Sequence, residues 1–184
     1  VRDDKQLKIT LGPMPTDRDL RTVDERAVNA PLDAIFDVAA NVLEWPTHLR
    51  HYRYVKFRSR SADGGGIVEM SANRPFGAIK WPTWWVSALV VNPPQRAERP
   101  SIRFRHIEGI TTGMDVEWEF EPTSSGLTHV RIVHVWNGPR WPVVGGVAAR
   151  GVIGPVFVHG IAPPTLEGLA KEAERRTTRL AADR

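Results

Sequence analysis

Two histidines on predicted strands are the side chains of this sequence best placed for chemistry. His106 belongs to the apolar set of a strand predicted at residues 101–107, and His134 to the apolar set of one at residues 127–137. Because side chains alternate along a strand, both histidines should face inward with their apolar neighbours. An imidazole with a pKa of about 6.5 could transfer a proton to a bound molecule. The simpler interpretation is a structural histidine whose ring only forms a hydrogen bond.

The sequence lacks the other common motifs of catalysis and cofactor binding. It has no phosphate-binding loop, no dinucleotide fingerprint and no helical His-Glu metal motif. His48 and His51 are close in sequence, but no carboxylate is paired with them, so no metal site is predicted. Because there is no cysteine, disulfides and thiolate zinc sites are excluded. We therefore expect neither a metal nor a cofactor.

An aromatic and basic stripe lies on the strand predicted at residues 51–61. Its members could stack on bases and contact phosphates, or contact an anionic membrane: Tyr52, Tyr54, Lys56, Arg58 and Arg60. A solvated strand face explains the same pattern more simply. The formal net charge of +4 and the pI of about 9.8 are too mild to argue for nucleic acid. We expect no nucleic-acid partner.

Length and composition indicate one globular domain. The 184 residues match the usual range of about 100–200 residues per domain, and apolar and charged fractions of 41% and 25% are ordinary for a soluble protein. We predict a lead-in at residues 1–20, a single domain at residues 21–178 and a tail at residues 179–184. The charged N-terminus lacks an apolar signal core, and the absence of cysteine suits a reducing compartment, so we expect a cytoplasmic protein.

Alternating apolar residues and intervening turns predict a strand, two short helices, six further strands and a final helix. The first helix should begin near Pro31, and the second should be broken internally at Trp45-Pro46. The predicted elements are a strand from residue 21, helices at 31–40 and 42–49, and strands at 51–61, 66–74, 79–91, 101–107, 112–121 and 127–137. The lead-in holds one further candidate strand at residues 7–11. Short connections favour an antiparallel meander, and a sheet of this size must curl around the last helix.

The alternation also predicts which side chains face that helix. On the strand at residues 112–121, the inward set is Met114, Val116, Trp118 and Phe120, and the outward set is Asp115, Glu117, Glu119 and Glu121. The other inward sets are also apolar, with the two histidines and a few hydroxyls among them. Such a mixture is typical of a ligand pocket, although aromatic residues, here including seven tryptophans, are also ordinary core material.

The last third of the chain has two parts. A glycine-rich apolar run at residues 143–162 is long enough to span a membrane, but its arginine, histidine and proline favour a helix packed in a soluble protein. Pro163-Pro164 should separate this run from a helical segment at residues 165–176. We expect the second part to pack on the sheet and the first to be a gate, a core helix or a membrane-facing element. We predict no transmembrane span, while peripheral membrane contact stays open.

The order of elements resembles the START-like, helix-grip superfamily, also called SRPBCC. VNAPLDAIFDVAANVLEWP at residues 28–46 is similar to the opening motif of its polyketide cyclase/dehydrase branch, with a proline, a paired Ile-Phe and a closing Trp-Pro. WWVSALVV at residues 84–91 and DVEWEFEPTSSGLTHVRIVHVW at residues 115–136 also resemble that branch. The resemblance covers about residues 23–174. It implies an α+β helix-grip fold, in which a curved antiparallel sheet of about seven strands wraps around a long C-terminal helix, with two short helices after the first strand.

The resemblance further implies a cavity for a hydrophobic ligand between the sheet and the C-terminal helix. Trp84, Trp85 and Trp118 match, or lie next to, pocket tryptophans of aromatase/cyclases in that branch. Those enzymes carry an inward arginine on the W-x-W-V-S-x-R strand, where this chain has Leu89, which has no donor or titratable group. The residues expected to line the cavity are Trp45, Val68, Met70, Trp85, Ser87, Leu89, Phe104, His106, Met114, Val116, Trp118, Phe120, His134 and Trp136.

Two functions stay open at this point. The first is binding of a lipid, polyketide-like or quinone-like molecule, which needs only the cavity. The second is cyclase or dehydratase chemistry, with His106 or His134 as the acid–base catalyst in place of the missing arginine. The superfamily includes cyclases, lipid carriers, hormone receptors and quinone binders, so the fold alone does not choose between them.

Overall fold

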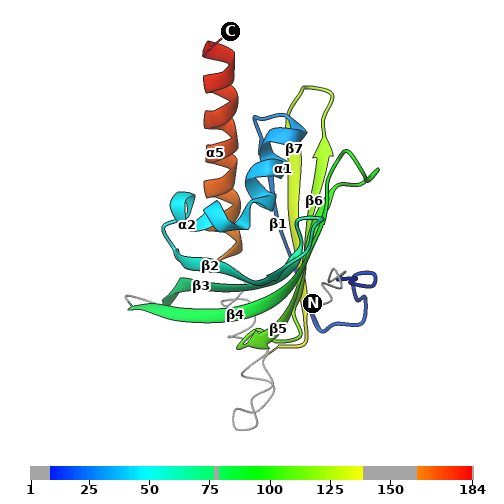
Figure 1. The fold of residues 1–184 in the computed structure, drawn as a ribbon, viewed down its shortest axis with the longest axis vertical. Coiled ribbons are helices and arrows are strands. Elements are labelled where there is room, and N and C mark those ends of the chain that lie inside the picture. Colours follow the sequence, from blue (N-terminus) through cyan, green and yellow to red (C-terminus); the bar gives the residue numbers. More distant parts are fainter. Residues whose placement is uncertain (1–8, 77–78, 139–160, 184) are drawn as a thin grey trace, which may run out of the picture.

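The computed structural model describes residues 9–76, 79–138 and 161–183 of the chain. Its elements follow the predicted order of one strand, short helices, six strands and a long C-terminal helix (Figure 1). Their bounds are β1 Leu20–Val28, α1 Leu32–Ala40, the 3₁₀ turn η1 Val42–Glu44, α2 Trp45–His48, β2 Tyr52–Arg60, β3 Gly66–Phe76, β4 Ile79–Asn92, β5 Ser101–Gly109, β6 Asp115–Pro122, β7 Thr128–Trp136 and α5 Ala162–Ala182.

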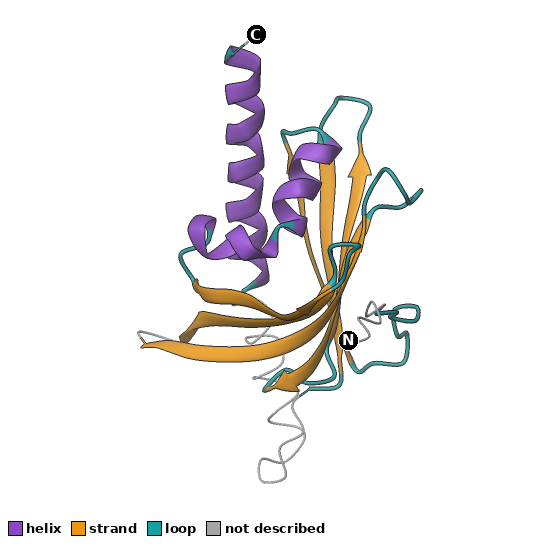
Figure 2. Ribbon diagram, viewed as in Figure 1, coloured by secondary structure: helices purple, strands orange, loops and turns teal. Residues whose placement is uncertain are grey.

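The strands form one seven-stranded antiparallel sheet in the order β1-β7-β6-β5-β4-β3-β2. Strands β2 to β7 pair with their sequence neighbours, as short connections predict. Strand β1 instead crosses the fold to pair with β7, with Leu20 opposite Trp136. The sheet is strongly curved, and the described helices lie on its concave side (Figure 2). The predicted helix-grip architecture is confirmed.

Two prolines set the starts of the short helices after β1. Pro31 is the N-cap of α1 in extended geometry, with φ −64° and ψ 155°. Asp33 follows in the first turn, where the helix dipole favours a negative charge. Pro46 lies in the first turn of α2, where its missing N–H removes no helical hydrogen bond. The predicted break at Trp45-Pro46 is confirmed as a change from η1 to α2.

Helix α5 begins at Ala162 with Pro163 and Pro164 in its first turn, so the proline pair starts the helix that packs on the sheet. Its predicted apolar stripe is buried in the core: Leu166, Leu169, Ala170 and Ala173. The helix continues to Ala182 and includes most of the predicted tail at residues 179–184. The division of the chain into lead-in, domain and tail stays a prediction.

Within the described part of the chain, no helix combines the length and apolar character needed to cross a membrane. The glycine-rich run at residues 143–162 lies outside the described residues except for Ile161 and Ala162, which are both buried. Its interpretation as a gate, a core helix or a membrane-facing element therefore stays a prediction.

Contrary to the predicted alternation, Asp115 on the outer face of the sheet does not face water. It is 1% exposed and forms ion pairs with Arg105 at 2.8 Å and with Arg103 at 3.8 Å. The reason is the lead-in, which covers this face: Arg103 donates a hydrogen bond to the backbone carbonyl of Gly12. A carboxylate can be buried in this way because cationic side chains pair with it.

The lead-in packs on the sheet without joining it as a strand. Residues 9–11 of the candidate strand at residues 7–11 have no strand geometry, and residues 7 and 8 lie outside the described residues. The strands beneath, β5, β6 and β7, each have both edges paired, so they offer no free edge for a further strand.

A β-bulge near the start of β2 reverses the predicted facing of Tyr52. The register with β3 shifts between Tyr52 and Tyr54, so Tyr52 pairs with Ala72 and Tyr54 with Ser71. Tyr52 is consequently buried on the inward face, whereas Tyr54 stays outside and donates a hydrogen bond to Glu69 at 2.9 Å. The predicted aromatic and basic stripe therefore lacks its first member and is partly neutralised by a carboxylate.

Candidate ligand pocket

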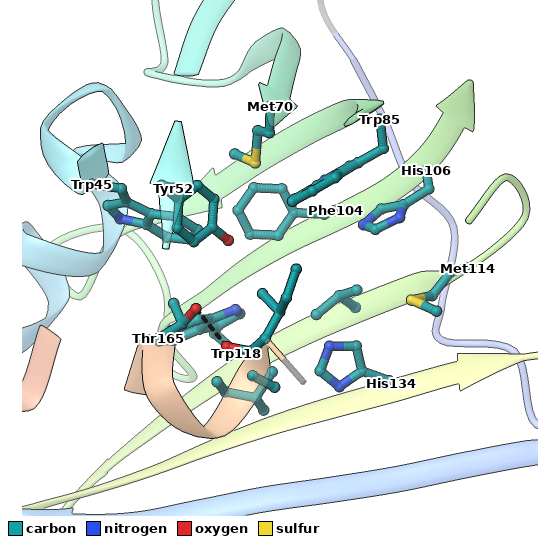
Figure 3. A pocket seen from close by; sticks show the side chains of 14 residues that line it. Trp45, Tyr52, Met70, Trp85, Phe104, His106, Met114, Trp118, His134 and Thr165 are labelled. Atoms are coloured by element: carbon teal, nitrogen blue, oxygen red, sulfur yellow. Dashed lines mark hydrogen bonds between the residues drawn. The ribbon is translucent and has the colours of Figure 1, made fainter. Parts of the chain in front are cut away.

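A pocket of about 60 Å³ lies between the concave face of the sheet and the first turn of α5. Its walls are mostly apolar and aromatic, and the side chains converge on it from strands and helices far apart in the sequence (Figure 3). The lining residues are Trp45, Tyr52, Met70, Trp85, Phe104, His106, Met114, Val116, Trp118, Ile132, His134, Ile161, Ala162 and Thr165.

Many of the residues expected at a cavity lie together in this pocket: Trp45, Met70, Trp85, Phe104, His106, Met114, Val116, Trp118 and His134. The others are buried in the core but do not line it: Val68, Ser87, Leu89, Phe120 and Trp136. Phe120, for example, packs edge-on against Phe36 of α1, with ring centroids 5.1 Å apart. Alternation predicts the face of a side chain but not its position along the strand relative to a pocket.

The remaining lining residues were not expected there: Tyr52, Ile132, Ile161, Ala162 and Thr165. The alternation of β7 does place Ile132 inward, so the sequence contains that signal. Tyr52 lines the pocket only because of the bulge in β2, which no local pattern reveals. The three residues at the start of α5 have no sequence signal beyond the proline pair that begins the helix.

Aromatic rings form one wall of the pocket around Trp45. Its ring lies 5.3 Å from that of Tyr52, 6.0 Å from that of Phe104 and 5.8 Å from that of Trp118, measured between centroids. The indole N–H of Trp45 donates to the carbonyl of Ala39 at 3.2 Å, which satisfies its single polar atom outside the pocket. The wall thus presents aromatic faces and edges to the space inside.

His106 enters the pocket from β5 and is 8% exposed. Its Nδ1 lies 2.6 Å from the hydroxyl oxygen of Thr111. The ring of Trp85 stacks against the imidazole, with a centroid distance of 5.9 Å and an interplanar angle of 20°. The ring orientation is therefore constrained both at its edge and on its face.

His134 lines the same pocket from β7, where it pairs with Val116 of β6. Figure 3 shows His106, Met114 and His134 at one end of the pocket, with Tyr52 and Thr165 toward the other. Two imidazoles at one end make that end the polar one, able to donate or accept hydrogen bonds and protons.

At the other end, a hydrogen-bond chain joins His51, which precedes β2, to α5. The hydroxyl of Thr165 donates to the carbonyl of Ile161 at 2.7 Å. Because a hydroxyl has one hydrogen, the contact of 2.9 Å between His51 Nε2 and Thr165 Oγ1 must use an Nε2–H donor. Burial lowers the pKa of His51 below its ordinary value, which favours this neutral donor form.

Among the described residues, the pocket is lined by apolar, aromatic, hydroxyl and imidazole side chains. Among the residues that the structure describes, no group of three or more histidine, cysteine, aspartate or glutamate side chains could hold a metal ion. The pocket can therefore bury apolar carbon, stack on flat rings and exchange hydrogen bonds or protons at the histidine end.

Comparison with known proteins identifies the family to which the chain belongs. The chain matches the family described as polyketide cyclase / dehydrase and lipid transport over residues 28–156, more than half of its length. No match is found among curated protein sequences.

Solved structures share the fold at low sequence identity. A Thermus thermophilus protein named TTHA0849 is 18% identical with a TM-score of 0.68, covering 90% of this chain and 100% of its own. Zhui aromatase/cyclase from Streptomyces sp. R1128 is 20% identical with a TM-score of 0.68, covering 85% and 94%. A START superfamily protein from Mycobacterium smegmatis is 17% identical with a TM-score of 0.61, covering 87% and 98%. These structures support the fold, the sequence match supports the family, and the chain belongs to the polyketide cyclase/dehydrase and lipid transport family of START-like proteins.

Proposed function

We propose that this chain binds a hydrophobic small molecule, of lipid, polyketide-like or quinone-like character, in the pocket between the sheet and α5. The observation that carries the proposal is the distribution of groups around the pocket: apolar and aromatic walls, with polar groups gathered at its ends. Small-molecule sites usually have this composition, because apolar area supplies affinity and a few polar groups fix orientation. Membership in a family described by lipid transport supports the same proposal.

The pocket must widen to hold such a ligand. Its volume of about 60 Å³ accommodates only a few atoms, whereas ligand sites usually have about 300–1,000 Å³. Met70 and Met114 are the lining side chains best suited to move, since methionine is unbranched and has three rotatable side-chain bonds. We expect a ligand to displace these two side chains first.

Native mass spectrometry of the purified chain, followed by organic extraction, tests the proposal. Met114→Trp should reduce the amount of bound species by filling the pocket. Ile107→Trp adds the same indole at a 41% exposed position of β5 and should retain the species. Retention of one and the same species by both variants would contradict binding in this pocket.

Chain stripped of any bound species is then titrated with palmitate and with menadione, which represent the lipid and quinone classes. We expect at least one of them to bind the wild type, and Met114→Trp to weaken that binding relative to Ile107→Trp. If neither molecule nor any purified species binds the wild type, the proposed function is wrong.

A cyclase or dehydratase-like enzyme is the second candidate, and the position of His106 and His134 at one end of the pocket favours it. In an intramolecular aldol condensation, a base removes a proton next to one carbonyl and the resulting carbon attacks a second carbonyl. The second oxygen takes a proton and becomes a hydroxyl group. Removal of a second proton from the attacking carbon then forms the double bond and expels that hydroxyl, which takes a further proton and leaves as water. Leu89 argues against the arginine-dependent variant of this chemistry, because it is fully buried and does not line the pocket.

The enzymatic alternative is tested with 2,6-heptanedione, whose cyclisation to methylcyclohexenone releases one water. Mass spectrometry follows the product in the wild type and in His106→Gln and His134→Gln. The matched control is His129→Gln, since His129 lies outside the pocket. Turnover that survives both pocket variants would exclude the histidines as acid–base catalysts, and absence of turnover in the wild type would leave ligand binding as the supported function.

A further inference from the structure

The end of the β3–β4 hairpin projects beyond the rest of the sheet as a two-stranded ribbon (Figure 1). The pairing of β2 with β3 reaches only to Ala72, and the pairing of β4 with β5 begins only at Trp85. Beyond these positions β3 and β4 pair with each other, as far as Phe76 and Ile79. A ribbon of two strands has little other structure to pack against, so its faces stay accessible.

Two large apolar side chains are exposed on this ribbon. Trp81 is 63% exposed and Trp84 is 48% exposed. The register of β3 and β4 is regular along its whole length, so the side chains of β4 alternate between the two faces. Trp85 lines the pocket on the concave face, so Trp81 lies on that same face and Trp84 on the opposite one. A protein partner packed on one face would leave one indole in water, whereas a lipid interface can surround both.

The ribbon also carries positive charge. Its residues 70–76 and 79–84 include Arg74 and Lys80 but no aspartate or glutamate. On the outer face, the exposed Arg53 of β2 donates a hydrogen bond at 3.3 Å to the hydroxyl of Ser71, which lies opposite Trp84 in the register. A positively charged segment without carboxylates complements the phosphate groups of anionic lipids.

We propose that the end of the β3–β4 hairpin docks on an anionic lipid bilayer and places the indoles of Trp81 and Trp84 at the level of the lipid headgroups. Tryptophan favours this level, because its ring is apolar and its N–H can still form a hydrogen bond. The cationic residues of the ribbon add attraction to the lipid phosphates. This surface is separate from the ligand pocket, and docking requires no bound ligand.

Docking would bring the pocket close to the bilayer. Trp81 and Trp85 are four residues apart on β4, a distance of about 13 Å at about 3.3 Å per residue of strand. Since Trp85 is part of the pocket wall, an apolar molecule would travel only a short distance between the bilayer and the pocket.

Sedimentation of the full-length chain with lipid vesicles tests the inference. The wild type should bind vesicles of phosphatidylcholine with phosphatidylglycerol more tightly than vesicles of phosphatidylcholine alone, and added salt should weaken this binding. Trp81→Ala and Trp84→Ala should each weaken it about tenfold, the effect of withdrawing one large apolar side chain from the interface. Leu180→Ala is the matched control, because it removes a 64% exposed apolar side chain from α5, and it should bind like the wild type.

Two further measurements separate contact with lipid from an effect on folding. Trp84→Tyr keeps an aromatic ring with a polar group, so it should retain most of the binding. In the wild type, lipids brominated near the headgroup end of their acyl chains should quench tryptophan emission more than lipids brominated near the chain ends. The double variant Trp81→Ala/Trp84→Ala should lose this quenching.

The inference is wrong if the wild type does not bind the anionic vesicles, if it binds them without quenching, or if the double variant binds them as tightly. Sedimentation velocity without lipid tests the other occupant, a second copy of the chain. A wild-type dimer that the double variant loses would show that the two indoles pack in a protein interface, and would also overturn docking on lipid. None of these outcomes depends on whether the pocket binds a ligand.

Discussion

Gly168 of α5 lies so close to Leu49 that a Cβ atom on the glycine would be 2.3 Å from Leu49 Cδ2. Leu49 is 2% exposed, so its side chain is confined by its own neighbours. Glycine within a helix costs about 1 kcal/mol relative to alanine. Here its lack of a side chain lets α5 approach the segment that follows α2.

We expect Gly168→Ala to lower the free energy of unfolding by about 1 kcal/mol, because overpacking of about 1–3 kcal/mol exceeds the gain in helix propensity. In a Leu49→Ala background the clash is gone, and the same substitution should raise the free energy of unfolding by about 1 kcal/mol. Urea denaturation of the four proteins measures both effects. Stabilisation by Gly168→Ala in both backgrounds would show that the contact is relaxed.

The buried carboxylate of Asp115 gives a second prediction. Asp115→Ala should lower the free energy of unfolding by about 3 kcal/mol, because it leaves Arg103 nearly buried without this partner. Glu119→Ala is the matched control on the same strand, since the Glu119 side chain is 37% exposed and its pairing with Arg131 is screened by water. Denaturant titrations should separate the two variants clearly, and equal losses would be evidence against the covering role of the lead-in.

The lowered pKa of the Glu172 carboxylate predicts that the protein loses stability in acid. A hydrogen bond from Arg175 is the largest cause that lowers the pKa of Glu172, from 4.5 to about 2. Burial acts in the opposite direction, and a hydrogen bond from Arg176 lowers the pKa further. The folded state therefore binds this proton less readily than the unfolded state. The resulting stabilisation, about 2 kcal/mol, is complete above about pH 4.5 and is lost as the pH falls toward 2.

Glu172→Gln should remove this pH dependence, so that its free energy of unfolding changes less than that of the wild type between pH 5 and pH 2.5. Glu167→Gln is the comparison on the same helix. The hydrogen bond from Lys171 also lowers the pKa of Glu167, but both side chains are exposed and water screens the pair, so we expect a smaller change than for Glu172→Gln. Urea denaturation at several acidic pH values gives both slopes. Parallel curves for the wild type and Glu172→Gln would contradict the assignment.

The lowered pKa of His51 predicts a second change of stability, at a pH near neutrality. Burial lowers its pKa in the folded state, so the unfolded state takes up the proton first as the pH falls through about 6.5. The wild type should therefore lose stability from pH 7 to pH 5 relative to His51→Gln. His129→Gln is the matched substitution at a histidine of β7 whose side chain is 35% exposed. Urea midpoints at the two pH values measure the difference, and a midpoint shift shared by all three proteins would contradict it.

Sequence reasoning succeeded where a local pattern determines the structure. Pro31 and the Trp45-Pro46 pair mark helix starts because proline restricts its own backbone and lacks an N–H. The alternation of β6 places Val116, Trp118 and Phe120 inward, and all three are buried. The inward position of His106 and His134 follows from the same rule, whereas their gathering at one end of the pocket does not.

The sequence does not predict the facing or burial of a side chain that depends on residues distant in the chain. Asp115 obeys the alternation of its strand, but a segment about one hundred residues earlier covers it. Tyr52 faces inward because of one irregularity in pairing with β3, which shifts a side chain to the other face. The contact between His106 and Thr111 joins β5 to the following turn, and the volume of the pocket depends on how side chains from several strands pack against the start of α5.

The pairing of β1 with β7 has a consequence for how the chain reaches this structure. Leu20 and Trp136 face each other although 116 positions separate them. Such high contact order slows folding, because the entropy of closing a long loop is lost before the pairing stabilises anything. During synthesis on the ribosome, β1 must wait with an unpaired edge until almost the whole sheet has been made. An unpaired strand edge can pair with another chain, so this edge is exposed to misassembly until β7 has been made.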